Sequence, residues 1–217
     1  MGTTMAFPVR SNGVNRKTRR SGFESLLPKE AKRPVLRNHQ IQHFEATNMP
    51  IREATIQDIA TLAMLISESN KDVALRFGLN AGNCAKHPSF CTADWIKTDL
   101  ARGERYFILE EDSKPIACVA YENPRVGLAY LNRLSVLPAH RNRGIGARMV
   151  QHIVQLAKTE SIQTISIGVI GEHTDLQRWY RKLGFISGET KRFPHLPFSV
   201  IYITHAVQSP DANPAHQ

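Results

Sequence analysis

A turn between two periodic segments carries the residues best suited to hold an anion. Before it, Ala129–Val136 alternates like a half-buried strand, and Pro138 closes that strand because proline has no backbone N–H for a ladder. After it, apolar residues recur at helical spacing from Ile145 to Ala157. The helix therefore begins near Gly144, where unpaired N–H groups and the positive end of the helix dipole favour a negative ligand. We expect phosphate groups to bind at this turn.

The residue types in the turn strengthen this expectation. Glycine lets a phosphate approach the backbone closely, and Arg141 and Arg143 add positive charge. An ordinary turn with a solvated arginine pair is the alternative interpretation of an isolated R-x-x-G-x-G pattern. A second segment favours binding, because Leu176–Leu183 has the pattern of a short helix that ends at Gly184, a residue typical of helix C-termini.

The two segments, in this order, resemble those of the GNAT superfamily of N-acetyltransferases. Arg141-x-x-Gly144-x-Gly146 is similar to the loop that binds the pyrophosphate of acetyl-CoA in that family, and Trp179–Phe185 is similar to its "YxKxGF" helix end. The resemblance covers about residues 49–205. It implies an α+β fold with a mixed, mostly antiparallel central sheet of six or seven strands flanked by helices.

The resemblance also implies which residues bind acetyl-CoA, the cosubstrate. The end of the central strand would offer backbone groups to the pantetheine arm at Ser135, Val136 and Leu137. The pyrophosphate loop would supply Arg141, Asn142, Arg143, Gly144, Ile145, Gly146 and Ala147. Within the expected cofactor site, one position departs from the family pattern, because His173 stands where members often place an asparagine that helps to hold the cofactor.

Acetyl transfer to an amine needs a proton acceptor and a proton donor. An alkylammonium of pKa about 10.4 must lose a proton before it can attack, and the leaving thiolate benefits from a nearby phenol. Tyr180 matches the family's tyrosine acid, and the alternative is an aromatic core residue. Many members carry a carboxylate on the central strand where this chain has Asn132, which cannot act as a base. The candidates for the base are Glu122, Glu172, His173 and His195, and selection of the neutral amine from solution is also open.

We therefore expect an acetyl-CoA-dependent N-acetyltransferase with direct transfer to a primary amine. Neither segment contains a cysteine for an acyl-enzyme. Small molecules and peptides are both open as acceptors. The alternatives are a catalytically weak module that senses acetyl-CoA, and an acetyltransferase of a basic or ribosomal protein. Lys191–Phe198 resembles the ending of a bacterial subgroup of unknown acceptor, and it either walls the acceptor pocket or forms a rigid strand connection.

Composition is that of a globular chain. The 217 residues give room for one core, and no apolar run approaches the roughly 20 residues of a membrane span, so we expect no membrane partner. Three scattered cysteines, Cys84, Cys91 and Cys118, are too few for a disulfide framework and suit the cytoplasm. Cys84, His87 and Cys91 lack a fourth ligand at suitable spacing, so we expect no metal. Monomer and homodimer are both open.

The net charge of +9 is concentrated near the N-terminus. Residues 1–48 hold nine Lys or Arg against three Glu. We interpret them as a basic, disordered extension or as a misassigned start ahead of Met49. A role in solubility is our main interpretation, and a nucleic-acid arm and an organellar presequence are the lesser alternatives. The acetyltransferase domain is expected over residues 49–205, with a disordered tail over 206–217.

Periodicity predicts the elements that must position these residues. Strands are expected over residues 51–54, 105–111, 115–122, 127–137, 163–169, 185–190 and 199–204. Helices are expected over 55–66, 71–77, 92–100, 143–159 and 174–183. A polar hairpin turn at 112–114 and a loop over 78–88 complete the pattern, and the loop would lie on the acceptor side in the resembling fold.

Overall fold

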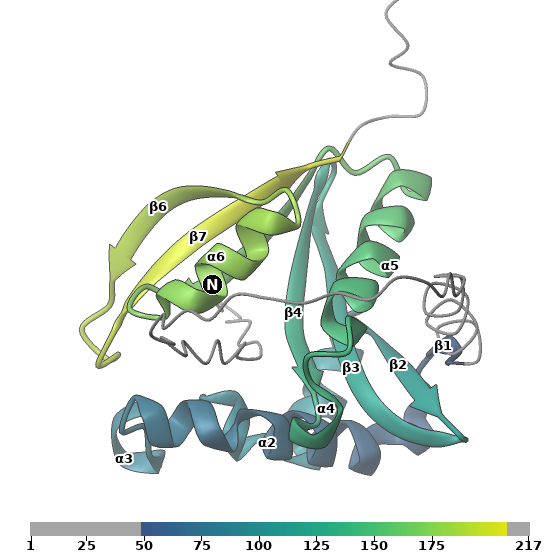
Figure 1. The fold of residues 1–217 in the computed structure, drawn as a ribbon, viewed down its shortest axis with the longest axis horizontal. Helices are drawn as coiled ribbons and strands as arrows, with labels where there is room; N and C mark the ends of the chain where they lie inside the picture. Colours follow the sequence, from purple (N-terminus) through teal and green to yellow (C-terminus); the bar gives the residue numbers. More distant parts are fainter. Residues whose placement is uncertain (1–48, 208–217) are drawn as a thin grey trace, which may run out of the picture.

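The computed structural model describes residues 49–207, which form one seven-stranded sheet flanked by helices (Figure 1). The strands follow the spatial order β1-β2-β3-β4-β5-β7-β6 and are β1 (Ile51–Glu53), β2 (Arg105–Glu111), β3 (Lys114–Arg125), β4 (Leu128–Val136), β5 (Thr164–Ile170), β6 (Ile186–Arg192) and β7 (Ser199–Ala206). The α-helices are α2 (Ile59–Arg76), α3 (Ala81–Cys84), α4 (Ala93–Ala101), α5 (Ile145–Thr159) and α6 (Thr174–Lys182). Short 3-10 helices are η1 (Ile56–Asp58), η2 (Pro88–Phe90) and η3 (Pro138–His140). The expected α+β fold with a mostly antiparallel sheet is confirmed.

Most predicted elements are present within one to three residues of their expected bounds. The turn between β2 and β3 has positive φ at Asp112 and Ser113, which is the backbone of a tight hairpin. Strand β7 continues to Ala206, and Val207 is buried, so both belong to the folded domain rather than to the tail. Our interpretations of residues 1–48 and of residues 208–217 lie outside the described part of the chain.

One predicted boundary is wrong, because residues 59–76 form a single helix instead of two, and the segment predicted as a loop over 78–88 contains the short helix α3. We ended the first helix near Ile66 since the polar residues that follow interrupt the apolar pattern. In the structure Asn70 lies on the buried face of α2, where its amide donates to Ile66 O at 2.8 Å and to Ser135 Oγ on β4 at 3.2 Å. A polar residue with a distant partner therefore continues the apolar face, and periodicity alone misses it.

Helices cover both faces of the sheet. Helices α5 and α6 pack on one face, over a core that includes Leu131, Met149 and Ile153 (Figure 1). Helices α2 and α4 pack on the other face of β2 and β3, where Leu62 and Ile108 are fully buried. The side chains of neighbouring residues on β2, β3 and β4 therefore point alternately toward the two helical layers.

Strands β4 and β5 are the parallel pair of the described sheet, and they separate along their length. They pair from Leu128 to Tyr130 on β4 and from Thr164 to Ser166 on β5, and no pairing between them continues beyond these residues. Figure 1 shows β4 and the half of the sheet that contains β6 and β7 close together at one end and apart at the other. From Leu131 onward, the edge of β4 that faces β5 therefore has no strand partner and is open to a ligand between the two halves of the sheet.

The segment between β6 and β7 packs against the end of α2. Phe193 and Leu196 join a cluster with Val73 and Ala74 of α2, and Phe198 is buried in the same cluster. The packing connects the β6–β7 half of the sheet to the helix on the other side of the separated strands. Lys191–Phe198 therefore does more than link two strands, because its apolar side chains hold it against α2.

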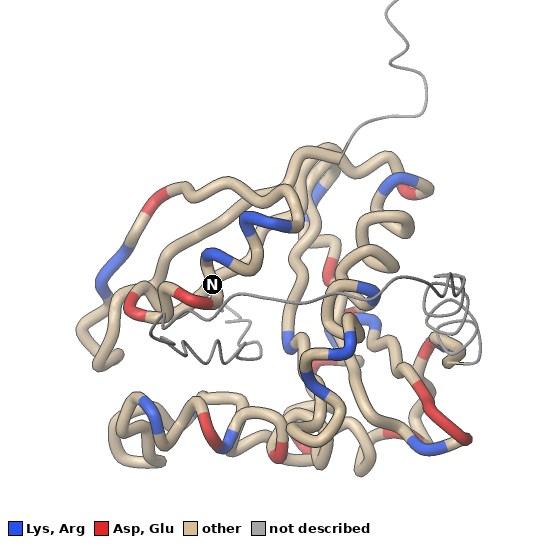
Figure 2. Tube along the Cα trace, viewed as in Figure 1, with Lys and Arg blue, Asp and Glu red and all other residues tan. Residues whose placement is uncertain are grey.

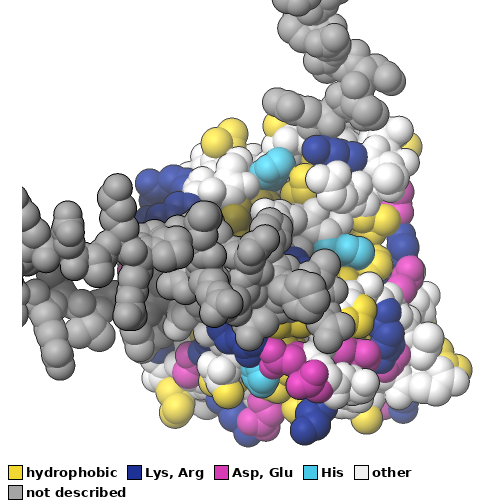
Figure 3. All heavy atoms as spheres, turned by 45° about the vertical axis from the view of Figure 1, so that its right-hand side comes forward, with side chains coloured by type: hydrophobic (Ala, Val, Ile, Leu, Met, Phe, Trp, Pro, Cys, Tyr) yellow, Lys and Arg dark blue, Asp and Glu magenta, His cyan; other side chains and the backbone are white. Residues whose placement is uncertain are grey.

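No helix among residues 49–207 is long and apolar enough to cross a membrane. Among the same residues, no three His, Cys, Asp or Glu side chains come together as metal ligands. His87 is buried, with its Nδ1 2.8 Å from Ser89 Oγ. Acidic and basic side chains lie next to one another along the lower edge of the face shown in Figure 3.

Candidate active site

Helix α5 begins with a backbone geometry that leaves its first amides open. Gly144 is the N-cap at φ +77, in the left-handed region, and no side chain caps the helix. The first i to i−4 bond runs from Arg148 N to Gly144 O at 3.0 Å, so the N–H groups of Ile145, Gly146 and Ala147 have no partner within the helix. A Cβ built on Gly144 would meet no atom within 4 Å. This is the geometry that suits a pyrophosphate at a helix N-terminus.

Both arginines of the turn are paired with carboxylates. Arg141 contacts Asp72 of α2 at 2.7 and 3.2 Å and also donates to Ser69 O at 2.5 Å. Arg143 pairs with Glu111 at the end of β2 at 2.5 Å. These basic residues lie where the chain passes from β4 into α5 (Figure 2). Protein carboxylates neutralise much of the charge of the two arginines, so an anion at this turn would be held mainly by the backbone amides.

The Arg141–Asp72 pair predicts a separable effect on acetyl-CoA binding. We expect Asp72→Asn to raise the KM for acetyl-CoA about three- to tenfold with little change in kcat, because the turn loses a fixed contact to α2. Steady-state kinetics would measure both constants. The matched control is Glu68→Gln on the same helix, whose ion pair with Lys71 is exposed and should have no measurable effect. Equal constants in Asp72→Asn and wild type would exclude this role.

Gly146 brings α5 against α6. A Cβ at this position would lie 3.3 Å from the Trp179 ring and 3.9 Å from a Val136 methyl carbon, so the glycine permits a close approach. Trp179 is partly buried against the main core. The loop that would hold the pyrophosphate therefore contacts the helix that carries Tyr180.

The side chain of Tyr180 lies wholly inside the core. Its exposed fraction is 0%, and its ring lies 4.8 Å from the ring of Trp179 and 5.2 Å from that of Phe185. The hydroxyl has no hydrogen-bond partner among the described residues. Burial holds the pKa of Tyr180 above its usual value, so the phenol stays protonated at neutral pH. Because a buried hydroxyl without a partner is costly, this O–H is available to a ligand that reaches the core.

Strand β4 has an irregular backbone where a ligand would pass. The β3–β4 register shifts between the pairs Ala120–Asn132 and Cys118–Ser135, and Arg133 within the shift has φ +53. Such a bulge re-aims the strand and interrupts pairing. The edge of β4 beyond the bulge faces away from β3 and has no β5 partner.

The three positions predicted for the pantetheine arm lie at this end of β4. The side chain of Ser135 points toward α2 and is bonded to Asn70. Val136 O already accepts from Arg141 Nε at 3.2 Å, and Leu137 N donates to Ile116 O at 3.0 Å. The Val136 carbonyl and the Leu137 N–H are therefore used within the protein. The other backbone groups along the free edge of β4 are the ones open to a ligand.

The structure separates the predicted candidates for the base. Glu122 on β3 is partly buried and accepts from Asn132 Nδ2 at 3.4 Å. His173 is buried at the start of α6, with its ring 5.5 Å from that of Phe77. His195 is exposed between β6 and β7, 5.8 Å from the ring of Phe193. Glu172 accepts from Ser199 N and Oγ at 3.2 and 3.1 Å. Of these four, Glu122 is the one hydrogen-bonded to the central-strand Asn132.

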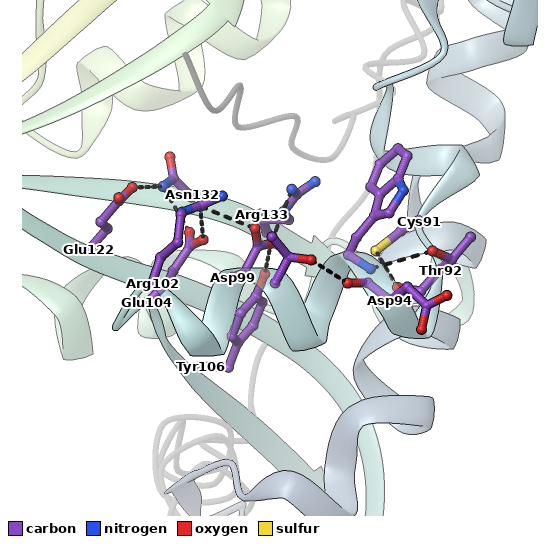
Figure 4. Close-up of polar contacts among 12 residues, drawn as sticks. Cys91, Thr92, Asp94, Asp99, Arg102, Glu104, Tyr106, Glu122, Asn132 and Arg133 are labelled. Carbon is purple, nitrogen blue, oxygen red and sulfur yellow. Dashed lines mark hydrogen bonds and ion pairs between the residues drawn. The ribbon is translucent and has the colours of Figure 1, made fainter. Parts of the chain in front are cut away.

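A second carboxylate, missed in the sequence, also contacts Asn132. Glu104 precedes β2 and is 1% exposed. Asn132 Nδ2 donates to Glu104 Oε1 at 2.9 Å, and Arg102 lies 3.2 Å from Oε2 (Figure 4). Asn132 thus stands between a carboxylate on β3 and one that directly precedes β2.

The buried residues Asp99, Tyr106 and Arg133 extend this cluster toward α4. Asp99 accepts from the Tyr106 hydroxyl at 2.8 Å and from Arg133 at 3.1 Å (Figure 4). Burial raises the pKa of Glu104 to about 7, and the negative charge of Asp99 adds to this, against the hydrogen bond from Asn132. Glu104 therefore exchanges a proton near neutral pH, which is the range in which catalytic groups operate.

A signal for Glu104 does exist in the sequence. Residues 104, 106 and 108 alternate onto one face of the strand, and Tyr106 and Ile108 on that face are fully buried. A carboxylate in line with buried apolar residues must be paired or functional, because an isolated buried charge is costly. We missed it because Glu104 stands outside the expected strand and next to a glycine.

A model of the acetyltransferase (GNAT) family matches residues 76–185. The match spans the turn before α5 and ends at Phe185, after the segment that carries Tyr180. The chain belongs to this family and is an acetyl-CoA-dependent acetyltransferase. No curated protein sequence matches the chain.

Solved structures share the architecture. The ribosomal-protein-S18-alanine N-acetyltransferase of Escherichia coli aligns with a TM-score of 0.61 at 14% identity, covering 76% of this chain and 97% of that one. The PaiA N-acetyltransferase of Thermoplasma acidophilum, in complex with coenzyme A, gives 0.61 at 18% identity and covers 73% and 98%. YncA of Salmonella typhimurium, a putative acetyltransferase with acetyl-CoA, gives 0.56 at 16% and covers 78% and 99%. These likenesses show the fold.

Proposed function

We propose that this acetyltransferase moves the acetyl group of acetyl-CoA directly to a primary amine. The observation that carries the proposal is the Tyr180 hydroxyl, which is fully buried and has no hydrogen-bond partner in the described chain. Tyr180 lies on α6, and the residue before it, Trp179, packs against Gly146 of the amide-lined turn. A cosubstrate held by its pyrophosphate at this turn would bring its thioester toward that hydroxyl.

The binding part of the proposal divides between two elements. The N–H groups of Ile145, Gly146 and Ala147 bind the pyrophosphate, helped by the dipole of α5. The free edge of β4 near Ser135 and Val136 binds the pantetheine arm by backbone hydrogen bonds, in the manner of an added strand. The separation of β4 from β5 gives this arm a path to the core.

The chemistry must remove two protons from an ammonium. One proton leaves before attack, so that nitrogen has a free electron pair for the thioester carbon. The C–N bond then forms and the C–S bond breaks, and Tyr180 protonates the departing sulfur. The nitrogen then loses its second proton, which returns Tyr180 to its protonated form. The products are the acetamide, coenzyme A as a free thiol, and one proton in solution.

Glu122 is the proton acceptor that the geometry favours among the candidates from the sequence. It contacts the side chain of Asn132, at the position where the family often carries a carboxylate. Its side chain is partly exposed, so a proton can pass from it to water. His173 and His195 lack this contact within the described residues, which favours Glu122 over both.

The state of the cysteines supports direct transfer. All three cysteines are buried. Burial raises the pKa of Cys91 to about 11 and also raises the pKa values of Cys84 and Cys118. A thiolate nucleophile is therefore disfavoured at each of these sites at neutral pH. An acyl-cysteine intermediate would need a thiol that the described fold keeps protonated.

Product analysis with a panel of amines tests the proposed function. The full chain is incubated with acetyl-CoA and with spermidine, lysine, tyramine or a peptide that begins with alanine, the residue named for the Escherichia coli structural neighbour. We expect thiol release that depends on one class of amine, together with an N-acetylated product in the mass spectrum. Binding of acetyl-CoA with no acetylated product across a broad amine and peptide panel would contradict the proposal and favour the sensing module.

A further inference from the structure

Asn132 is held by two carboxylates that fix the direction of its amide. It is 1% exposed, and its Nδ2 donates to Glu104 at 2.9 Å and to Glu122 at 3.4 Å. An ionised carboxylate can only accept, so the NH2 group must face the two glutamates. Glu104 immediately precedes β2, Glu122 lies on β3 and Asn132 lies on β4. Residues on or directly next to three adjacent strands thus determine one side-chain orientation.

The other end of this amide has no partner. Since the NH2 group faces the glutamates, Oδ1 points away from Glu104, as Figure 4 shows. Within residues 49–207, no group donates a hydrogen bond to Asn132 Oδ1. A nearly buried amide oxygen in this state has the capacity to accept from a ligand. The ligand must supply an N–H or O–H group.

The charge around the free oxygen is negative. The nearby cations, Arg102 and Arg133, are directed to Glu104 and Asp99. Glu122 forms no ion pair with any residue that the structure describes, although its carboxylate lies beside the Asn132 amide. A partly buried carboxylate without a cation favours a positive ligand. The free acceptor and the unpaired charge therefore point to the same class of ligand, a protonated amine.

We propose that Asn132 Oδ1 and the Glu122 carboxylate together form the subsite for the ammonium group of the acceptor. Glu104 is a positioning residue, because it acts by holding the Asn132 amide. This inference rests on the proposed amine acetylation and deepens it. The subsite recognises a primary ammonium by two of its three N–H donors, so a quaternary ammonium of the same charge is excluded from it. Asn132 thereby has a role at the position where it cannot act as a base.

Glu104 gives the subsite a dependence on pH. The charged or titratable groups that face Glu104 are Cys91, Asp99, Arg102, Tyr106, Glu122 and Arg133. The pKa of Glu104 is raised to about 7, so above this pH the carboxylate accepts from Asn132, and below it the carboxyl takes up a proton. The hydrogen bond from Asn132 Nδ2 to Glu104 is therefore strongest at alkaline pH and weakens as the pH falls through about 7.

The first test uses small ammonium ions and needs no turnover. In protein labelled with 15N at asparagine side chains, we expect methylammonium chloride to shift the Asn132 NH2 resonances saturably. Tetramethylammonium chloride at the same ionic strength should leave them unchanged, because it has no N–H donor. Equal responses to both ions, or no response to methylammonium, would overturn the proposal. Because the reading does not depend on acetyl transfer, such a failure leaves the proposed function in place.

Variants separate positioning from simple stability. Asn132→Leu has no side-chain amide, so methylammonium binding to the variants is followed by the backbone amide resonances of β3 and β4. Asn132→Leu, of similar size, should weaken this binding about tenfold or more without changing the Kd of acetyl-CoA. Glu104→Leu should weaken methylammonium binding by a similar factor. Glu104→Gln keeps an oxygen that can accept from Asn132, so its affinity for methylammonium should stay within about threefold of the wild type. If Glu104→Leu does not fold, the comparison of Asn132→Leu with Glu104→Gln decides. Equal effects of Glu104→Gln and Asn132→Leu in folded protein would contradict a positioning role.

A pH titration of the same resonances completes the test. In the wild type we expect the Asn132 NH2 resonances to move with a midpoint near pH 7, the pKa of Glu104. The midpoint should disappear in Glu104→Gln and persist in Arg125→Gln, a control at an exposed residue of β3. A midpoint that persists in Glu104→Gln would assign the titration to another group and overturn the role of Glu104.

Discussion

Tyr180→Phe is expected to lower kcat about a hundredfold or more while the Kd of acetyl-CoA stays near that of the wild type. The change removes one oxygen atom from a core position, and the ring contacts to Trp179 and Phe185 remain. Without the phenol, the sulfur must leave as an unprotonated thiolate, and a positioned acid is worth about 10²-fold to 10⁴-fold. Single-turnover kinetics with a saturating amine would measure the loss at the chemical step.

The same variant has an expected signature in stability. An ordinary buried tyrosine loses stability when its hydrogen-bonded hydroxyl is removed, but the Tyr180 hydroxyl has no partner in the described chain. We therefore expect the Tm of Tyr180→Phe without ligand to equal or exceed that of the wild type. Tyr106→Phe is the matched control, because it removes a buried hydroxyl bonded to Asp99 and should lower Tm. An unchanged kcat in Tyr180→Phe would reject the acid role.

Gly144→Asp is expected to weaken coenzyme A binding at least about tenfold. Residue 144 is at the N-cap of α5, and a side chain placed there enters the open space in front of the amides of Ile145 and Gly146. A carboxylate in that space repels the pyrophosphate, at about 1 kcal/mol for a 4 Å pair of unit charges in water and more where solvent is excluded. Isothermal titration calorimetry with coenzyme A would give both Kd values.

Gly144→Asn isolates the charge from the backbone. Asparagine has nearly the shape of aspartate and tolerates the left-handed conformation, which Asn142 already adopts at φ +62. We expect Gly144→Asn to bind coenzyme A several-fold more weakly than the wild type but clearly better than Gly144→Asp. If the two variants bind equally, charge at this position does not matter, and the anion site lies elsewhere.

The parts of the fold that sequence predicted well are those set by neighbouring residues. Thr92 caps α4 through its side chain, and the hairpin turn at Asp112 and Ser113 is fixed by local backbone preference. Helix α2 was divided in two because the residue that continues it, Asn70, is satisfied by Ser135 from β4. A periodic pattern depends on residues close together in the sequence, whereas Ser135 is 65 residues away from Asn70.

The candidate site divides in the same way. Gly144 and Tyr180 stand in short segments that carry their own signal, so the sequence pointed to both. The contacts of Arg141 with Asp72 and of Asn132 with Glu104 join residues 69 and 28 positions apart. The register of three strands and the packing of α2 create these contacts, and no local pattern reports them. The arginines were predicted as anion ligands, but the structure directs both guanidinium groups to carboxylates of the protein.

The central claim is that the amides at the start of α5 hold the pyrophosphate of acetyl-CoA. Backbone amide NMR of the folded chain during titration with coenzyme A tests it most directly. We predict saturable shifts that are largest for Ile145, Gly146 and Ala147, the residues whose N–H groups have no partner within the helix. Saturable binding that leaves these three resonances in place, or no binding by well-folded protein, would contradict the account.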